Sequence, residues 1–308
     1  MKTKIVSLLF TIFISSGYSG EFIDHLRKLD DKTPVETIRN VDYMYVINLD
    51  HRPEKYEMTM RELAPYGIKP YRFSAVNAWK LPFDVVDDVC LKFEKGMRPG
   101  GMGTVYRHVN GKEYHSHEIV EVEGTPYICH CTARGALGCV LSHLTVMYDA
   151  LCSGYNTVWI CEDDIEVVQD PNILSRYIED LDRIVGRENW DVFYTFRDYR
   201  GPGGKYYTAY GGAYHPGVDT RDQNKYNINR PISTYLRQSG SRFGTQSMIW
   251  TRNGIKKVLE HYKKYRIFLP YDLELTIIPG IKMYSVQEDV VTNILDALSD
   301  LGSTNQSL

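Results

Sequence analysis

Three consecutive acidic residues, Glu162, Asp163 and Asp164, follow an apolar run in the stretch VWICEDDIEV, residues 158–167. Adjacent carboxylates repel one another, and a hard divalent cation relieves that repulsion, because Mg²⁺ and Mn²⁺ prefer oxygen ligands. On an extended strand Glu162 and Asp164 would share a face and Asp163 would oppose them, unless the chain turns there. The cluster therefore predicts a metal site, and a solvated turn after a strand is the alternative.

The surrounding chain alternates between strand-like and helical stretches. Apolar residues spaced four, three, four and three apart predict a helix over residues 137–151, which leads to the acidic stretch. Further helices are expected from Pro53 to Gly67, after Asp170-Pro171 and after residue 251. Strands are expected at 43–49, 71–76, 157–161, 190–196 and 245–251.

This alternation predicts an α/β fold with a mostly parallel sheet and helices on both faces. In such sheets ligands bind beyond the carboxyl ends of the strands. Glu162, Asp163 and Asp164 lie at that end of the strand that begins at Thr157, so they are expected at a binding site.

Two segments interrupt the alternation. Residues 95–132 contain Asn110-Gly111 between strand-like runs, which predicts a β-hairpin insertion. Residues 197–242 are rich in Gly, Tyr, Arg and Pro and have no sustained period. A long Tyr/Gly-rich loop of this kind either closes over a substrate or is a flexible insertion.

The composition is that of a globular protein. Of the 308 residues, 43% are hydrophobic and 24% charged, and the net charge of -3 gives no footprint for nucleic acid. Residues 1–20 have two lysines, an apolar run and small residues in the order of a secretory signal. We therefore expect a mature chain that starts near Glu21 and lies outside the cytoplasm or in the secretory pathway. The alternative is a retained segment that associates with a membrane and faces the cytoplasm.

Histidine and cysteine pairs occur in the first interrupting segment. His115 and His117, and Cys129 and Cys131, are each two residues apart, so each pair would share a strand face. Together they could form a zinc site. A disulfide or free thiols are the alternatives for the cysteines.

Several motifs together resemble glycosyltransferase family 25, the lipooligosaccharide and procollagen galactosyltransferase group. YVINLDHRPEKY (45–56) resembles the family's opening element, and SAVNAW (74–79) lies where the family has a short Ala-Val-Asp-Gly-like stretch. GALGCVLSHLTVMYDA (135–150) resembles its Gly-x-x-x-Ser-His helix through Gly138, Ser142 and His143. VWICEDDIEV matches its Glu-Asp-Asp strand and LPYDLEL (269–275) its late Pro-x-Asp element. Lys55 and Asn77-Ala78 depart from the family pattern.

The resemblance implies a GT-A-like fold over residues 41–300, between an extension at 21–40 and a tail at 301–308. It also implies transfer, with inversion, of a hexose such as galactose from a UDP-sugar. The acceptor would be a glycan, a lipooligosaccharide or a protein hydroxyl, which places the chain in lipopolysaccharide biosynthesis or a related pathway. Mn²⁺ or Mg²⁺ held by Asp164, with Asp163 or Glu162 in support, would neutralise the departing UDP.

The same resemblance assigns donor-binding residues. Asn48 and Arg52 lie just beyond the first strand, where a nucleotide could dock, and Arg52 offers a planar fork for phosphate. Arg52 could instead be a surface residue at a helix start. Ser142 and His143 are expected near the donor, with His143 donating to a phosphate or a sugar hydroxyl or filling a structural role.

An inverting transfer also needs a base that takes the proton of the acceptor hydroxyl. Asp272 is the candidate, because Pro270 disfavours helix just before it and the segment could present a side chain into a cleft. Glu274 is the second candidate, since it would share a face with Asp272 in an extended segment. The alternative is that Asp272 caps the next turn.

Two other functions remain open on the sequence alone. A non-catalytic sugar-nucleotide-binding module would keep the fold and lack turnover. A metal-dependent phosphohydrolase would use the same acids, although such enzymes usually gather ligands for two metals from several strands.

Overall fold

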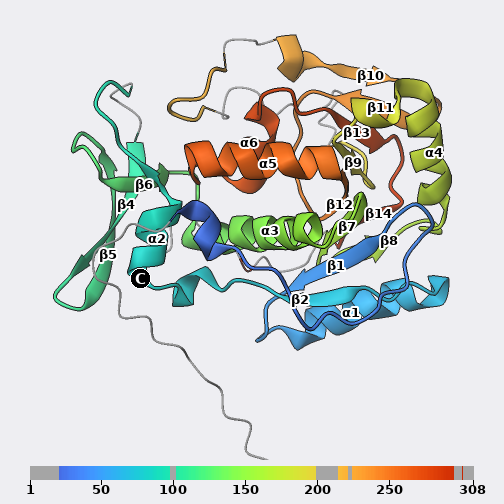
Figure 1. Ribbon diagram of the computed structural model, residues 1–308, viewed down its shortest axis with the longest axis horizontal. Coiled ribbons are helices and arrows are strands. Elements are labelled where there is room, and N and C mark those ends of the chain that lie inside the picture. The colour runs from blue at the N-terminus through green and yellow to red at the C-terminus, as the bar shows by residue number, and fades with distance from the viewer. Residues whose placement is uncertain (1–20, 98–101, 199–213, 221–223, 295–299, 301–308) are drawn as a thin grey trace, which may run out of the picture.

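An eight-stranded sheet organises the described part of the chain in this computed structural model (Figure 1). The described residues are 21–97, 102–198, 214–220, 224–294 and 300. The strand order is β10-β11-β13-β9-β12-β7-β1-β2. The strands are β1 (Tyr43–Asn48), β2 (Tyr71–Ser74), β7 (Thr157–Glu162), β9 (Val192–Tyr194), β10 (Asn229–Pro231), β11 (Leu236–Ser239), β12 (Ser247–Thr251) and β13 (Met283–Val286).

The sheet is mixed in direction. Strands β2, β1 and β7 run parallel, as predicted, and so do β9 and β13. Strand β12 is antiparallel to both β7 and β9, and β11 is antiparallel to β10 and β13. The α/β class is confirmed, but strand direction follows from how each connection crosses the sheet, and the residue pattern of a strand does not reveal it.

Helices cover both faces of this sheet, as predicted. The helices are α1 (Pro53–Leu63), α2 (Phe83–Val89), α3 (Arg134–Cys152), α4 (Ile173–Val185), α5 (Arg252–Tyr265) and α6 (Tyr271–Ile277), with 3₁₀ turns η1 (Phe22–His25), η2 (Ala64–Tyr66), η3 (Ala78–Lys80), η4 (Arg187–Asn189) and η6 (Asn224–Asn227). One core joins α3 and α5 to alternate residues of β1 and β7, and a second joins α4 to the residues between them. Strands buried on both faces need continuous apolar runs, which explains the sequences YMYVIN and TVWIC.

Helix α3 is the main support of the site. Among the described residues it is the one helix long and apolar enough to cross a membrane, but 72% of its apolar window is buried inside the protein. Figure 1 shows it crossing the sheet beside α5. Its apolar surface is therefore explained by the core on which it packs.

The predicted hairpin is present beside the main sheet. Strands β4 (Met102–Val109) and β5 (Lys112–Ile119) are joined by Asn110 and Gly111, whose φ values of 52° and 77° suit this two-residue turn. With β3 (Leu91–Lys92) and β6 (Pro126–Cys129) they form a second sheet in the order β3-β6-β4-β5.

The four residues considered for a zinc site do not form a metal-ligand cluster among the described residues, because β4 separates the two pairs. His115 and His117 lie on β5 and the cysteines lie at the end of β6, on opposite sides of β4. Neighbouring strands are about 4.8 Å apart, so roughly 10 Å separates the two backbones. His117 Nδ1 instead lies 3.0 Å from Thr104 Oγ1.

Part of the long Tyr/Gly-rich segment belongs to the main sheet. Residues 199–213 and 221–223 lie outside the described part, so the closing-loop interpretation stays open. The remainder supplies β10 and β11, the two strands at one end of the sheet. We expected no strand in this segment, and that expectation is wrong for residues 229–231 and 236–239, which form β10 and β11. A small ladder between β8 (Ile165–Val167) and β14 (Val291–Asn293) completes the fold.

The expected signal, residues 1–20, and the expected tail, residues 301–308, lie outside the described part. The extension at 21–40 packs on the domain through Phe22, Leu26 and Ile38, which are buried. Lys32 Nζ also reaches Asp149 Oδ2 on α3, at 2.6 Å.

Candidate functional site

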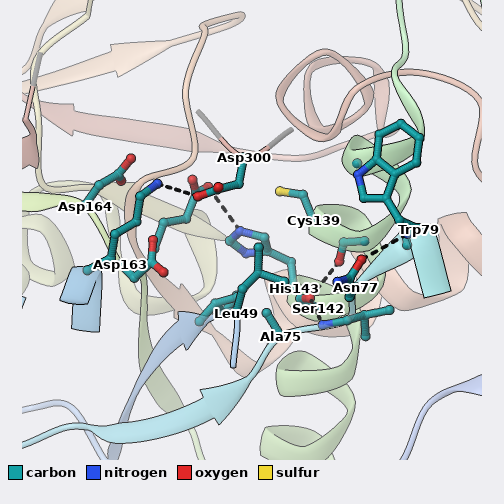
Figure 2. Close-up of a pocket in the computed structure, with 17 residues that line it drawn as sticks. Leu49, Ala75, Asn77, Trp79, Cys139, Ser142, His143, Asp163, Asp164 and Asp300 are labelled. Carbon is teal, nitrogen blue, oxygen red and sulfur yellow. Dashed lines mark hydrogen bonds and ion pairs between the residues drawn. The ribbon is translucent and has the colours of Figure 1, made fainter. Parts of the chain in front are cut away.

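The chain turns directly after β7, and this turn gathers the three acids in one pocket. Strand β7 ends at Glu162, residues 163 and 164 form a bend, and β8 begins at Ile165. Glu162, Asp163 and Asp164 all line a pocket that encloses about 710 Å³, counted out to its open mouth (Figure 2). The chain therefore turns where a turn was needed for all three carboxylates to face one ligand.

The pocket lies at the carboxyl ends of the parallel strands. Ile47 of β1 pairs with Glu162 of β7 and with Phe73 of β2, and the residues just beyond these strands, Leu49 and Ala75, also line the pocket. This is the position at which α/β sheets bind ligands.

Glu162 is held by two partners. Its Oε1 lies 3.3 Å from His143 Nε2 and accepts a hydrogen bond of 2.7 Å from Thr245 Oγ1. Burial opposes ionisation of Glu162, but the bond from His143 and that from Thr245 prevail, and the net effect lowers the pKa of Glu162. Glu162 is therefore a carboxylate at neutral pH.

Asp163 is bound to the first strand. Its Oδ2 accepts a hydrogen bond of 2.6 Å from Asn48 Nδ2. Asn48 is buried and also donates to the Arg52 carbonyl and accepts from Arg72 Nε. Burial raises the pKa of Asp163. Asn48 thus orients Asp163 and does not line the pocket, although it was expected to contact a nucleotide directly.

Asp164 has the carboxylate best placed to receive a ligand. Among the described residues no other side chain donates to it, and the bond from Ile294 N goes to its backbone carbonyl. Burial, followed by the charge of Glu162, raises the pKa of Asp164 to about 6. An ionised carboxylate without a partner, beside two more, is a donor set that fits a hard divalent cation.

A second set of ligand atoms lies deeper in the pocket. Cys139, His143 and Glu162 each offer one atom, and these atoms lie within 4.8 Å of one another. Burial raises the pKa of the Cys139 thiol well above its usual range. Among the described residues this group combines a thiol, an imidazole and a carboxylate as possible metal ligands. Its carboxylate, that of Glu162, also belongs to the acidic triplet.

Two cations at the pocket are paired with an acid from the far end of the chain. Asp300 forms ion pairs with Arg52 and with Lys55, the latter at 2.6 Å. Lys55 and Asp300 line the pocket, whereas Arg52 lies beyond them at the N-terminus of α1. Figure 2 shows Asp300 between the acids and Cys139.

Helix α3 and the loop after β2 form the opposite wall. A Cβ on Gly138 would lie 2.3 Å from the Val76 carbonyl, so only glycine allows this close approach. Ser142 Oγ donates to the Gly138 carbonyl at 2.6 Å and accepts from Val76 N at 2.8 Å. Ser142 therefore fixes the loop, which presents the half-exposed Trp79 on the side of the pocket away from Asp163 (Figure 2).

The extended form in which Glu274 would share a face with Asp272 is absent, because residues 271–277 form helix α6 with Pro270 as its N-cap. Proline is favoured at a helix start, and its restriction falls on Leu269, which lies before α6. Asp272 and Glu274 consequently do not share a face.

Asp272 lies in the first turn of α6 and is neither its N-cap nor a lining residue of the pocket. Its Oδ2 accepts from Gly244 N at 3.1 Å. Burial raises the pKa of Asp272, and the charge of Glu162 raises it further. The acid is thus close enough to the pocket to be influenced by the charge of Glu162.

Glu274 is buried in a separate polar cluster. Its Oε1 lies 2.5 Å from His261 Nε2 and 3.6 Å from His215 Nε2, and its Oε2 accepts from Leu269 N. Burial raises the pKa of Glu274 to about 7 and lowers that of His261 to about 4. Both shifts favour uncharged forms, so the contact is a hydrogen bond between neutral groups near pH 6. Glu274 does not line the pocket.

The lining residues to which the sequence patterns assigned no role include Lys55, Trp79, Cys139 and Asp300. Lys55 and Cys139 lie inside the quoted motifs, so attention to whole motifs could have found them. Trp79 carried a weak signal as an aromatic residue next to Asn77-Ala78. Asp300 carried none, because only folding brings it to residues 52 and 55.

The fold and site define an α/β protein with an acidic, ligand-sized pocket at the carboxyl ends of parallel strands. Comparison with known families specifies it further: the family described as glycosyltransferase family 25 (LPS biosynthesis protein) matches residues 41–275. The chain belongs to glycosyltransferase family 25, and this membership supports a glycosyltransferase role.

Curated relatives agree at low identity. The chain is 24% identical to a "Glycosyltransferase 25 family member" of Drosophila pseudoobscura pseudoobscura over 54% of this chain and 22% of that protein. It is 24% identical to one of Aedes aegypti, over 56% of this chain and 24% of that protein. It is 22% identical to "Inactive glycosyltransferase 25 family member 3" of Homo sapiens, over 51% of this chain and 22% of that protein. The matches thus span about a quarter of these relatives.

Proposed function

We propose that the protein transfers a hexose, galactose in the first instance, from a UDP-sugar to a hydroxyl of a glycan, lipooligosaccharide or protein acceptor, with inversion. The observation that carries this proposal is the joint placement of Glu162, Asp163 and Asp164 in one pocket at the carboxyl ends of β1, β2 and β7. Membership of glycosyltransferase family 25 supports the reaction class. We expect a GT-A-like arrangement of donor and metal.

Asp164 is the principal ligand for Mn²⁺ or Mg²⁺, and Glu162 or Asp163 assists it. When bound, the cation would neutralise negative charge on the UDP leaving group. Asn48 holds the Asp163 carboxylate, and Thr245 and His143 hold that of Glu162. These bonds set the carboxylates in place before a ligand arrives and so reduce the cost of ordering them.

Lys55 and Arg52 bind the diphosphate. Both already form ion pairs with Asp300, a lining residue of the pocket, and this supports binding of an anion there. A diphosphate that takes its place must displace Asp300, and the guanidinium of Arg52 suits bidentate binding of phosphate oxygens.

Trp79 and His143 form the sugar-binding wall. Trp79 is 48% exposed at the pocket and offers an aromatic face to a pyranose or to the uracil ring. His143 is fully buried and touches Glu162, so it keeps that carboxylate oriented. Ser142 acts through the loop that it anchors.

Asp272 is the proposed base. Its raised pKa makes it a better proton acceptor than an ordinary aspartate. It takes the proton of the acceptor hydroxyl as that oxygen attacks the anomeric carbon from the face opposite UDP. Glu274 is excluded from the proposal as a base, because it is fully buried and its two carboxylate oxygens already contact His261 and the Leu269 N–H.

The test is a screen of nucleotide sugars with the purified protein, read as released UDP with and without excess EDTA. We expect one UDP-hexose to be turned over only when Mn²⁺ or Mg²⁺ is present. Full activity in EDTA would remove the metal from the proposal, and two tightly bound metals with phosphate release would favour the phosphohydrolase.

A second candidate is a non-catalytic sugar-nucleotide-binding module. A curated human relative carries the word "Inactive" in its name, and Asp300 pairs with both proposed phosphate-binding cations. Saturable UDP binding without hydrolysis or transfer of any donor would favour this function.

We also propose that the protein works outside the cytoplasm or in a secretory-pathway lumen, with residues 1–20 as the targeting segment. N-terminal sequencing of the native protein checks this, since a chain that begins near Glu21 is expected. An intact Met1 in a cytosolic fraction would contradict it, and an intact Met1 in membranes would favour the anchor.

A further inference from the structure

The turn between β6 and α3 brings two cysteines together. Thr132 N donates to the Cys129 carbonyl at 2.9 Å, which closes a β-turn over Cys129, His130, Cys131 and Thr132. In an extended strand, residues two apart are separated by roughly 6.6 Å along the chain. The turn instead places Cys131 Sγ only 2.7 Å from Cys129 Sγ.

This separation is unusual for two thiols that are not bonded. Unbonded heavy atoms make their best contact at roughly 3.5–4.0 Å, and a sulfur–sulfur bond measures about 2.05 Å. The 2.7 Å between the two sulfurs of this turn lies between these values. The backbone of this turn therefore accommodates two sulfurs at a distance from which a small movement forms the bond.

The two thiols differ in access and acidity, as exchange chemistry requires. Cys131 is exposed, whereas Cys129 is buried. The hydrogen bond with the Cys129 thiol, followed by the charge of the adjacent His130, lowers the pKa of Cys131 below that of an ordinary cysteine. An exposed thiol of low pKa is the one that attacks a disulfide.

We propose that Cys129 and Cys131 are a redox-active pair that forms a reversible intrachain disulfide by exchange with a small-molecule disulfide such as oxidised glutathione. This inference is independent of the proposed transfer reaction. It needs neither His115 nor His117, which β4 separates from the cysteines.

The exchange balances in two steps. The Cys131 thiolate attacks one sulfur of oxidised glutathione, and the other sulfur leaves as a glutathione thiolate. Cys129 then loses its proton to solvent and attacks Cys131 Sγ, and the second glutathione leaves. The two protein thiols are oxidised by two electrons, and one glutathione disulfide is reduced to two thiols.

The ring would close where three parts of the fold meet. Cys129 N and Thr132 Oγ1 both donate to the Phe268 carbonyl, at 2.9 and 3.1 Å. Phe268 lies just before Pro270 and α6, and Thr132 lies just before α3. The turn is thus fixed on both sides, which favours ring closure over a lasting mixed disulfide with glutathione.

The test equilibrates the purified full chain in glutathione buffers of increasing oxidised fraction, quenches with acid and alkylates the remaining thiols. Intact-mass and peptide analysis should show loss of two hydrogens on the peptide that contains Cys129 and Cys131, without a glutathione adduct. The equilibrium constant should be at least about tenfold larger for the folded chain than for the same chain in denaturant, because folding raises the effective concentration of the second thiol.

Three variants complete the test. Cys129→Ser should stop at a glutathione adduct on Cys131, and Cys131→Ser should protect Cys129 from reaction. Cys152→Ser, which removes another exposed thiol, should leave the equilibrium unchanged. The proposal is overturned if both thiols of the wild-type chain stay alkylatable in excess oxidised glutathione, if Cys131 stops at the adduct, or if folding does not raise the constant.

Discussion

Among the described residues, Glu162 and Glu274 each contact a histidine, and the two contacts differ in access. Glu162 and His143 meet at 3.3 Å on the wall of the pocket, and Glu274 and His261 meet at 2.5 Å inside the protein. Hydrogen bonds lower the pKa of Glu162 against the effect of burial, whereas burial raises that of Glu274 to about 7.

The difference teaches that a pair of reactive groups indicates function only when a ligand can reach it. Glu162 has Thr245 as a further donor and two neighbouring acids, and it borders an open pocket. Glu274 satisfies a buried histidine and the backbone N–H of Leu269. Buried polar groups are hydrogen-bonded for stability, and that need alone accounts for the second pair.

The largest effect is expected when Asp164, the acid next to the Glu162–His143 pair, is removed. Asp164→Ala should abolish metal-dependent turnover, with a fall of about 10³-fold or more, since metal stabilisation of a leaving group contributes several kcal/mol. Released UDP is the measurement. Glu166→Gln changes an exposed acid two residues away and should keep full activity, so equal losses in both variants would contradict a special role for Asp164.

Asp272 is related to both glutamates. It is two residues from Glu274 in the sequence, and the charge of Glu162 raises its pKa. Asp272→Asn should lower transfer by roughly 10²-fold while donor and metal binding persist, which is the usual scale of general-base catalysis. Donor affinity, melting temperature and transfer rate on this variant decide the matter. A loss of about 1 kcal/mol of stability with normal transfer would indicate that Asp272 only holds the Gly244 N–H.

The two histidines provide the direct comparison. His261→Ala removes the nearer histidine partner of the buried Glu274, so it should cost about 2–3 kcal/mol of stability and leave transfer by the folded protein nearly unchanged. His143→Ala should lower transfer by about tenfold, because Glu162 loses one of its two positioning bonds. Chemical denaturation and transfer assays on both variants separate the pairs, and the comparison fails if the two histidines show the same pattern.

The acidic pocket should also make the free energy of unfolding depend on pH. Burial raises the folded-state pKa of Asp164 from 3.8 to about 6, so the folded protein binds more protons than the unfolded chain between these values. Stability from this group therefore falls as pH rises from about 4 to about 6. Asp164→Asn should stabilise the metal-free protein by about 1–2 kcal/mol at pH 7, allowing for screening of a partly exposed carboxylate, and by almost nothing below pH 4.

Measured unfolding free energies of both proteins across this range, in EDTA, check the sign. A variant that is equally stable at every pH would indicate that the carboxylate is well solvated. Added Mn²⁺ should reverse the order at pH 7, since only the wild-type chain retains the ligand.

The smallest expected effect concerns Asp300. Its carboxylate would compete with a diphosphate for Arg52 and Lys55. Asp300→Asn weakens its ion pairs with Arg52 and Lys55. Because Lys55 is buried and Asp300 is part-exposed, their pair should contribute about 1 kcal/mol, the upper end for surface pairs, and UDP should bind about fivefold more tightly. Titration calorimetry with UDP measures this, and weaker binding would mean that Asp300 assists the donor.

The sequence by itself determined the class of fold and the position of the acidic cluster. Continuous apolar runs such as residues 43–48 and 157–161 are required by strands buried on both faces, and the apolar spacing over α3 matches the helix found. Asn110-Gly111 likewise specified its hairpin, because few other residues adopt positive φ at both turn positions. These are local properties, so a single sequence contains them.

Only the tertiary structure decided strand directions, the helix at 271–277 and the partners of each acid. The sequence could not place Asp300 beside Lys55, because the pairing joins residues 245 positions apart. Nor could it separate Glu162 from Glu274, since both are acids near apolar residues. Access to solvent depends on how distant elements pack, and for this reason one glutamate faces a pocket and the other is buried in the core.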